Sequence, residues 1–295
     1  MRRACLEYRR AVARFAAVTP GRLAAGYARA LRLHWRGPQR FAPNNSARAT
    51  RLVVTLSTTP RRARRLLPAL RSLIDQSVAA DRIILALPRV SRRDATPYPE
   101  PAELGLPEGV DVLRCSDEGP ATKLLPALRE EAAACLVVVD DDVVYPRDFL
   151  ATLLAAHEAA PGAVVGYRGV ALEPDVAFAQ LPHVFATALR TPRPVDVMFG
   201  TWGYLVPPGA LDGSVADFSS APDGVRNVDD VWISGHLARR GAARLVVPAS
   251  MYPIETLATL AGSLTGDVNV TGDNDRAAVA LFAGDWRRAT RATDQ

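Results

Sequence analysis

The segment VVVDDDVVYP, residues 137–146, decides the fold of this chain. It belongs to an apolar run, residues 135–139, of the kind found in parallel strands that are covered on both faces. Three consecutive carboxylates, Asp140, Asp141 and Asp142, follow this run directly. Because open α/β sheets bind ligands beyond the carboxyl ends of their strands, the segment predicts a central strand that ends at a ligand site.

The sequence on both sides of this segment alternates between β-branched runs and helical patterns. Strands are expected at residues 51–58, 82–87, 110–115, 135–139, 163–167, 204–206 and 244–247, and helices at residues 60–74, 118–128, 149–160 and 228–240. The alternation predicts an α/β fold with a mixed, mostly parallel sheet and helices on both faces.

The chain divides into a basic N-terminal extension, residues 1–48, and one large domain, residues 49–295. The extension carries Glu7 as its only acid before residue 41, and its pattern predicts two amphipathic helices divided near Pro20. Two interpretations stay open. Residues 1–40 lie on an anionic membrane surface, with arginine stems beside the apolar face, or they form a helical extension packed on the domain.

The composition bounds the location and the partners of the chain. Three cysteines without a CxxC pair favour a reducing, cytoplasmic setting, and no apolar run is long enough to span a bilayer. A peripheral position at the inner face of the membrane is compatible with both observations. Nucleic-acid binding is not expected, because no recognition motif accompanies the basic charge.

The acidic triplet, Asp140 to Asp142, has the chemistry of a divalent metal site. Side chains alternate along a strand, so Asp140 and Asp142 are expected on one face, with Asp141 pointing away. Two carboxylates held close together favour a cation, and oxygen-only ligation suits Mg²⁺ or Mn²⁺. Alone, the triplet also fits a strand end that meets water, or the acidic strands of receiver domains, haloacid-type phosphatases and Toprim-like nucleotidyl sites.

Lys123 stands out because all but one of the 36 basic residues are arginine. It lies in the segment GPATKL, residues 119–124, which is expected to be a turn that opens a helix. A helix start favours anions, and a lysine there neutralises a nucleotide or its phosphates. The alternative is an ordinary solvated lysine.

Two further segments carry candidate site residues. Asp229 and Asp230 open the helix expected at residues 228–240, where they are either caps or a general base, with Asp230 preferred as the base. Trp202, Gly203 and Tyr204 lie in an aromatic, glycine-rich loop that offers a surface for the donor or acceptor sugar, or else packs in the core. Residues 266–275 form either a flap over the site or a plain surface loop.

Taken in order, these segments resemble bacterial family-2-like glycosyltransferases of the GT-A superfamily, the nucleotide-diphospho-sugar transferases, and more distantly exostosin-type transferases. The resemblance covers residues 51–282. The matching pieces are the polar end of the first strand and the segments GPATKL, VVVDDDVVYP, GYLVPP and VDDVWISGHLARRG.

The resemblance implies roles for individual residues. It implies nucleotide contacts for the end of the first strand, at Thr55, Ser57, Thr58 and Arg61. It places Asp140 on the ribose side and Asp142 on a metal bound to the diphosphate, with Asp140 as a second metal ligand. The catalytic carboxylate falls on Asp229 and Asp230, and the family's Glu-Asp pair is Asp-Asp here, so the choice of base stays open.

The expected function is transfer of a sugar from a nucleotide-diphosphate sugar to a hydroxyl of a saccharide or lipid-linked acceptor, with Mn²⁺ or Mg²⁺ as cofactor. Inversion and retention both stay open. One alternative is a nucleotidyltransferase or another metal-dependent nucleotide enzyme, although residues 58–61 are not the glycine-rich loop such an enzyme needs. A second alternative is a non-catalytic carbohydrate-binding protein on the same fold.

Overall fold

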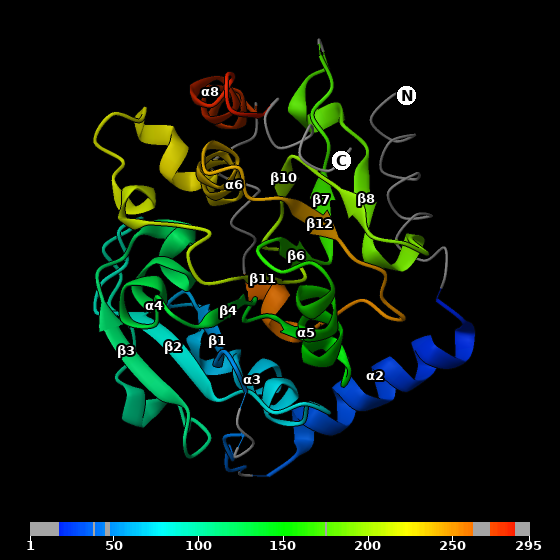
Figure 1. Ribbon diagram of the computed structural model, residues 1–295. Helices are drawn as coiled ribbons and strands as arrows, with labels where there is room; N and C mark the ends of the chain where they lie inside the picture. Colours follow the sequence, from blue (N-terminus) through cyan, green and yellow to red (C-terminus); the bar gives the residue numbers. More distant parts are fainter. Residues whose placement is uncertain (1–17, 38, 45–47, 175, 262–271, 287–295) are drawn as a thin grey trace.

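The computed structural model describes residues 18–37, 39–44, 48–174, 176–261 and 272–286 (Figure 1). In this part of the chain the main sheet has eight strands in the order β3-β2-β1-β4-β11-β6-β12-β9. Their bounds are β1 Leu52–Ser57, β2 Arg82–Pro88, β3 Asp111–Cys115, β4 Cys135–Val138, β6 Val164–Gly166, β9 Arg193–Pro194, β11 Tyr204–Val206 and β12 Arg244–Val246.

Helices pack on both faces of this sheet (Figure 1). The α-helices are α2 Pro20–Trp35, α3 Leu67–Ile74, α4 Leu125–Glu130, α5 Phe149–Ala159, α6 Asp229–Arg239 and α8 Asp273–Leu281. The short 3-10 turns are η1 Ala63–Arg65, η2 Pro101–Glu103, η3 Gly119–Lys123, η4 Phe178–Gln180, η5 Ala186–Ala188, η6 Gly213–Ala216, η7 Asp223–Asn227 and η8 Leu257–Ala261.

The strand directions confirm the predicted mixed, mostly parallel α/β sheet. Strands β3, β2, β1 and β4 are parallel neighbours, β11 runs antiparallel between β4 and β6, and β12 returns to a parallel pairing with β6. Strands β1 and β4 are almost fully buried, as expected of strands covered on both faces. Their side chains form the centre of one continuous hydrophobic core.

Two small sheets were not anticipated from the sequence. Strands β7 Arg168–Val170, β8 His183–Phe185 and β10 Val197–Met198 form one, and β5 Val143–Val144 pairs with β13 Ile254–Glu255 in the other. Segments of two or three residues are too short to show a period of two, so their pairing depends on the tertiary fold.

The register of β1 on β4 fixes what lies at the carboxyl edge of the sheet. Thr55 is the partner of Val138, so the same register, extended by three residues, brings Thr58 opposite Asp141. Strand β11 begins at Tyr204, which also pairs with Val138. Because β11 is antiparallel to β4, the loop before it lies at this same edge, beside the acidic triplet.

One local prediction at this edge is wrong and one is confirmed. Strand β4 ends at Val138 and the acidic triplet follows it, so strand alternation does not set the directions of the three side chains. The turn expected at residues 119–124 is present as the 3-10 turn η3, which ends at Lys123, and α4 begins at Leu125.

The helix α2 confirms the second of the two N-terminal helices, and the first lies outside the described residues. It packs on α3 and β13, with Leu33 fully buried. Its outer face exposes Tyr27, Leu31 and Trp35, which repeat every four residues. Among the described residues, no helix combines the length and the apolarity needed to cross a bilayer. Most of the loop expected at residues 266–275 also lies outside the described residues.

Candidate functional site

Asp141 is held by polar partners from the loop that follows β1. Its Oδ2 accepts a hydrogen bond of 2.5 Å from the Thr58 hydroxyl, and its Oδ1 accepts one of 3.1 Å from Nη1 of Arg62. The side chain is 5% exposed. With its hydrogen bonds directed into the protein, Asp141 ties the acidic triplet to the neighbouring loop.

The carboxylate of Asp142 has fewer polar partners among the described residues than that of Asp141. Nη1 of Arg62 lies 3.1 Å from its Oδ2, so one guanidinium bridges Asp141 and Asp142. Burial and the two neighbouring aspartates nevertheless raise the pKa of Asp142 to about 6. An additional positive charge nearby would stabilise the ionised form of such a carboxylate.

The carboxylate of Asp140 has different partners, which come from the loop before β11 and from η3. Its Oδ2 accepts a hydrogen bond of 3.1 Å from the backbone N–H of Trp202, and its Oδ1 lies 3.9 Å from Nζ of Lys123. Its own N–H donates a 2.7 Å hydrogen bond to the hydroxyl of Tyr145. Burial raises the pKa of Asp140, and the nearby Lys123 partly offsets that rise.

Lys123 joins the acidic triplet to the start of α6. Its ammonium lies 3.5 Å from Oδ2 of Asp229 and 3.9 Å from Oδ1 of Asp140. Burial alone would lower the pKa of this ammonium, but Asp229, Asp140 and Asp230 together hold it above the usual range. We call Lys123, Asp140, Asp229 and Asp230 the lysine cluster.

Gly200 lies against the lysine cluster, where a side chain would displace the lysine. A Cβ at this position would clash with Nζ of Lys123 and crowd Oδ1 of Asp230. The backbone N–H of Gly200 donates a 2.8 Å hydrogen bond to the same Oδ1. Burial, followed by the charge of Asp229, raises the pKa of Asp230 to about 7.

The next two residues of this loop adopt a left-handed backbone. Trp202 has a φ of +78°, rare for a residue with a side chain, and Gly203 has a φ of +87°. The conformation directs the Trp202 N–H at Asp140, and a Cβ on Gly203 would meet the Phe149 ring. Strained backbone of this kind gathers at functional sites.

The three residues expected to contact a sugar are buried where they stand. Trp202 is 3% exposed and stacks on Tyr252, with ring centroids 5.5 Å apart. Tyr204 is 2% exposed and lies in β11. The loop thus contributes to the site mainly through backbone groups at Gly200 and Trp202.

The residues expected to contact the nucleotide lie at the end of β1. Thr55 is fully buried, and its hydroxyl donates to the carbonyl oxygen of Lys123 at 2.7 Å. Thr58 binds Asp141 as described, Ser57 is half-buried, and Arg61 is exposed. A hollow of about 460 Å³ lies at the ends of β2 and β3, lined by Arg89, Val90, Arg114, Cys115, Ser116 and Asp117.

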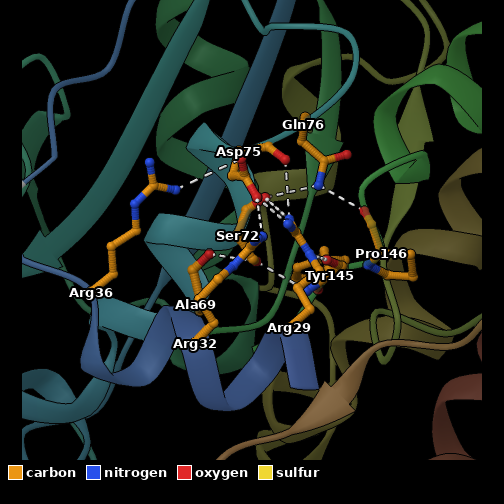
Figure 2. Close-up of polar contacts among 9 residues, drawn as sticks. All are labelled: Arg29, Arg32, Arg36, Ala69, Ser72, Asp75, Gln76, Tyr145 and Pro146. Carbon is orange, nitrogen blue, oxygen red and sulfur yellow. Dashed lines mark hydrogen bonds and ion pairs between the residues drawn. The ribbon is translucent and has the colours of Figure 1, made fainter. Parts of the chain in front are cut away.

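The helix α2 is linked to the acidic triplet by hydrogen bonds that pass through Arg29 and Tyr145. Arg29 donates from Nε to the carbonyl oxygen of Tyr145 at 3.3 Å, from Nη2 to the carbonyl oxygens of Ser72 and Asp75, and from Nη1 to the Asp75 carboxylate (Figure 2). The N–H of Tyr145 donates to the Ser72 hydroxyl at 3.0 Å. A continuous set of contacts therefore runs from α2 through Tyr145 to the backbone of Asp140.

Two contributors to the site, Arg62 and Tyr145, were missed from the sequence, and a third, Gly200, was expected only as part of its glycine-rich loop. Arg62 is one arginine among many and carries no signal of its own. Tyr145 is part of the quoted segment VVVDDDVVYP, but nothing in the pattern shows that its hydroxyl returns to Asp140. Gly200 marks the close approach of backbone to a site, which is a signal that glycine-rich loops do provide.

The acidic triplet has carboxylates that could hold a divalent metal together with a nucleotide phosphate. Among the described residues, no three His, Cys, Asp or Glu side chains converge as a ready-made metal site. Mg²⁺ that carries a nucleotide phosphate needs only one or two carboxylates, since phosphate oxygens and waters complete the coordination. Asp142 and Asp140, whose pKa values are raised by burial, fit that requirement.

Comparison with known proteins gives structural likeness only. No protein-family model matches the chain, and no curated protein matches its sequence. The mannosyltransferase PcManGT from Pyrobaculum calidifontis, solved in complex with GDP-Man and Mn²⁺, aligns with a TM-score of 0.49 and 18% identity, over 94% of this chain and 76% of its own.

A second similar structure is TarS 1-349 from S. aureus, solved alone and in complex with UDP. Its two structures align with a TM-score of 0.49, at 11% and 12% identity, over 80% of this chain. The chain spans 65% of that TarS chain.

Proposed function

We propose that this chain is a metal-dependent glycosyltransferase that moves a sugar from a nucleotide-diphosphate donor to a hydroxyl of an acceptor. The observation that carries the proposal is the lysine cluster. It brings Asp140, at the end of a central strand, within ion-pair distance of a lysine that also contacts Asp229 at the start of α6. Carboxylates for a metal and a candidate general base thus lie on two sides of one buried ammonium.

Asp230 is the proposed general base. Its pKa of about 7 matches the task, because a base of this strength is about half ionised at pH 7 and still accepts a proton readily. Asp229 is the less suitable candidate, since its carboxylate is buried against the Lys123 ammonium. In this mechanism Asp230 removes the proton of the acceptor hydroxyl if the anomeric centre inverts.

Asp142 and Asp140 are the proposed ligands of Mn²⁺ or Mg²⁺. When bound, the ion supplies positive charge to the leaving diphosphate. Lys123 contributes a second positive charge in the same region, and Asp140 also faces the ribose. Asp141 keeps its bonds to Thr58 and Arg62 and positions the triplet without touching the ligand.

The nucleotide is proposed to lie along the carboxyl ends of the parallel strands. Ser57 is the last residue of β1 and Thr58 and Arg61 follow it, while the Thr55 hydroxyl donates to the carbonyl oxygen of Lys123. The hollow at the ends of β2 and β3 is the place for the base, because it continues the same edge of the sheet. The donor or acceptor sugar is proposed to meet the loop that contains Trp202, Gly203 and Tyr204. These three residues are buried, so the exposed residue Thr201 is the surface that the loop offers.

The acceptor is a saccharide or a lipid-linked sugar, and the partner surface is an anionic membrane. Support comes from the exposed face of α2, where Tyr27, Leu31 and Trp35 form an apolar stripe and the exposed Arg32 and Arg36 accompany it. We place the catalytic domain at residues 49–295 and the extension at residues 1–48, with a cytoplasmic location at the inner face of the membrane.

A donor-hydrolysis assay tests the class. The full chain is incubated with UDP- and GDP-sugars, with Mn²⁺ or with chelator, and release of the nucleotide diphosphate is measured. We expect metal-dependent release that Asp142→Ala abolishes, and acceptor-dependent transfer that Asp230→Asn lowers by about a thousandfold. Turnover that survives both chelator and Asp142→Ala contradicts the metal assignment, and formation of UTP or GTP together with sugar 1-phosphate when pyrophosphate is added would favour a nucleotidyltransferase.

A further inference from the structure

A second cavity, distinct from the lysine cluster, lies between the end of α2, the start of α3 and η8. Its volume is about 470 Å³. Three arginines, Arg64, Arg65 and Arg71, line it together with His34, and none of its described lining residues is acidic. A concave surface with charges of one sign concentrates ligands of the opposite sign, so the cavity favours an anion.

Two of these arginines have no carboxylate partner among the described residues. Arg64 is paired with Glu103, whereas in the described part of the chain neither Arg65 nor Arg71 forms an ion pair. Arg71 donates to the carbonyl oxygens of Leu33 and His34 at 2.9 Å and 3.0 Å. Burial and the nearby Arg36 lower its pKa, as expected where the surroundings are already positive.

The rest of the cavity wall is apolar. Leu67, Pro68, Leu257 and Ala258 contribute to it, and Leu257 is 60% exposed. Trp35, next in sequence to the lining residue His34, is 77% exposed. An inorganic anion would leave this apolar surface in water, whereas an anion that carries a hydrocarbon chain would cover it.

One wall of the cavity is fastened to the acidic triplet. Thr256 lines the cavity, and its N–H and hydroxyl both donate to the carbonyl oxygen of Asp142, at 2.8 Å and 3.0 Å. The Thr259 hydroxyl donates to the same oxygen at 3.3 Å. A ligand in the cavity therefore lies across one short segment of chain from a proposed metal ligand.

We propose that this cavity binds the phosphate end of a lipid-linked acceptor, with a guanidinium on the phosphate and Leu257 against the first carbons of the chain. The proposal rests on the glycosyltransferase function and names its acceptor class as a saccharide linked to an alkyl phosphate or diphosphate. Such an acceptor would have its phosphate held by Arg65 and Arg71 while a hydroxyl of its sugar extends toward the lysine cluster.

Binding without donor tests the site independently of catalysis. Affinities of the full chain for octyl phosphate, inorganic phosphate and octyl glucoside are measured by calorimetry, below the micellar concentration. We expect octyl phosphate to bind at least about tenfold more tightly than either other compound, because only it engages both the arginines and the apolar wall. Arg65→Gln and Leu257→Ser should each weaken that binding by about fivefold to tenfold.

Arg190→Gln is the matched control, since Arg190 is an exposed arginine outside the cavity. It should bind octyl phosphate as the unmodified chain does. Equal affinity for octyl phosphate and octyl glucoside overturns the proposal, as does unchanged binding in both cavity variants. Binding of inorganic phosphate as tight as that of octyl phosphate shows a free-phosphate site and also overturns it. Failure of the donor-hydrolysis assay, by contrast, counts against the glycosyltransferase function itself.

Discussion

Neighbouring aspartates in this site have opposite surroundings, which separates their roles. Asp141 accepts bonds from Thr58 and Arg62, whereas Asp142 shares Arg62 with it and has a pKa raised to about 6. The same division holds at α6, where Asp229 faces Lys123 and Asp230 accepts from Gly200. In each pair, one carboxylate is held by the protein and the other is destabilised in its charged form.

The raised pKa of Asp230 makes activity and stability depend on pH in opposite senses. Its folded-state pKa of about 7 lies above its ordinary value of 3.8, so the folded chain holds a proton that the unfolded chain has lost. Stability from this group therefore falls as pH rises from about 4 to about 7, while kcat rises over the upper part of that range as the base ionises.

Asp230→Asn should remove both effects. The amide oxygen still accepts from Gly200, but no charge is buried, so we expect a melting temperature about 4 °C higher at pH 8 and no difference near pH 4. Calorimetric scans at the two pH values measure the shift, and kcat of the unmodified chain from pH 5 to 9 gives the activity profile. Identical scans for both proteins at pH 8 would show that Asp230 is not destabilised by its charge.

At the scale of elements, the long buried segments could be predicted from sequence and the short ones could not. The strands β1, β2 and β4 and the helix α6 have clear apolar patterns, and each lies within two residues of its expected bounds. Strands β7, β8 and β10 are too short for a period to show. The apolar pattern of a strand such as β11 also does not indicate whether the strand pairs in parallel or antiparallel. The antiparallel pairing of β11 with β4 and β6 brings Gly200 and Trp202 to the site.

The same limit applies to the side-chain partners. Lys123 and Asp230 were recognised by their rarity or by their place at a helix start. Arg62 and Arg29 were not, because a chain in which nearly every basic residue is arginine gives no reason to choose one of them. Their roles follow from contacts between segments 79 and 116 residues apart, which only the folded chain brings together.

The contacts of α2 predict that the N-terminal helix affects the donor site. Arg29→Gln removes the guanidinium that joins Asp75 and Tyr145, and Tyr145 holds the N–H of Asp140 (Figure 2). We expect the free energy of unfolding to fall by about 2 kcal/mol and the affinity for GDP or UDP to fall about fivefold, measured well below the melting temperature.

Arg32→Gln is the control for this prediction. Arg32 lies about one helical turn away and reaches the same Asp75 at 3.4 Å, but its side chain is 63% exposed, so its loss should change neither stability nor nucleotide affinity measurably. If Arg29→Gln lowers stability and leaves nucleotide affinity unchanged, α2 braces the fold without positioning Asp140.

At the scale of the whole molecule, α2 combines two roles that the sequence left as alternatives, packing on the domain and contact with a membrane. Its inner face packs on the domain through Leu33 and Arg29, and its outer face keeps Tyr27, Leu31 and Trp35 exposed. The cavity at its C-terminal end then lies beside this outer face, since His34 lines the cavity and Trp35 follows it. Packing on the domain and contact with a membrane are therefore compatible roles of one helix.

Flotation with lipid vesicles tests the outer face of α2. Deleting residues 1–40 would also remove Arg29 and expose the α3 surface, so substitutions on the outer face are the sharper test. Leu31→Ser combined with Trp35→Ser should reduce binding to anionic vesicles by more than about tenfold, because each side chain gains roughly 2 kcal/mol on leaving water.

Val90→Ser is the matched control, as Val90 is a half-exposed apolar residue outside α2. It should float with anionic vesicles as the unmodified chain does. Neutral vesicles should bind neither protein well, and added salt should weaken the anionic binding, because exposed arginines such as Arg32 act over about one Debye length. Unchanged flotation of the double variant would assign any membrane contact to another surface and leave α2 with its packing role alone.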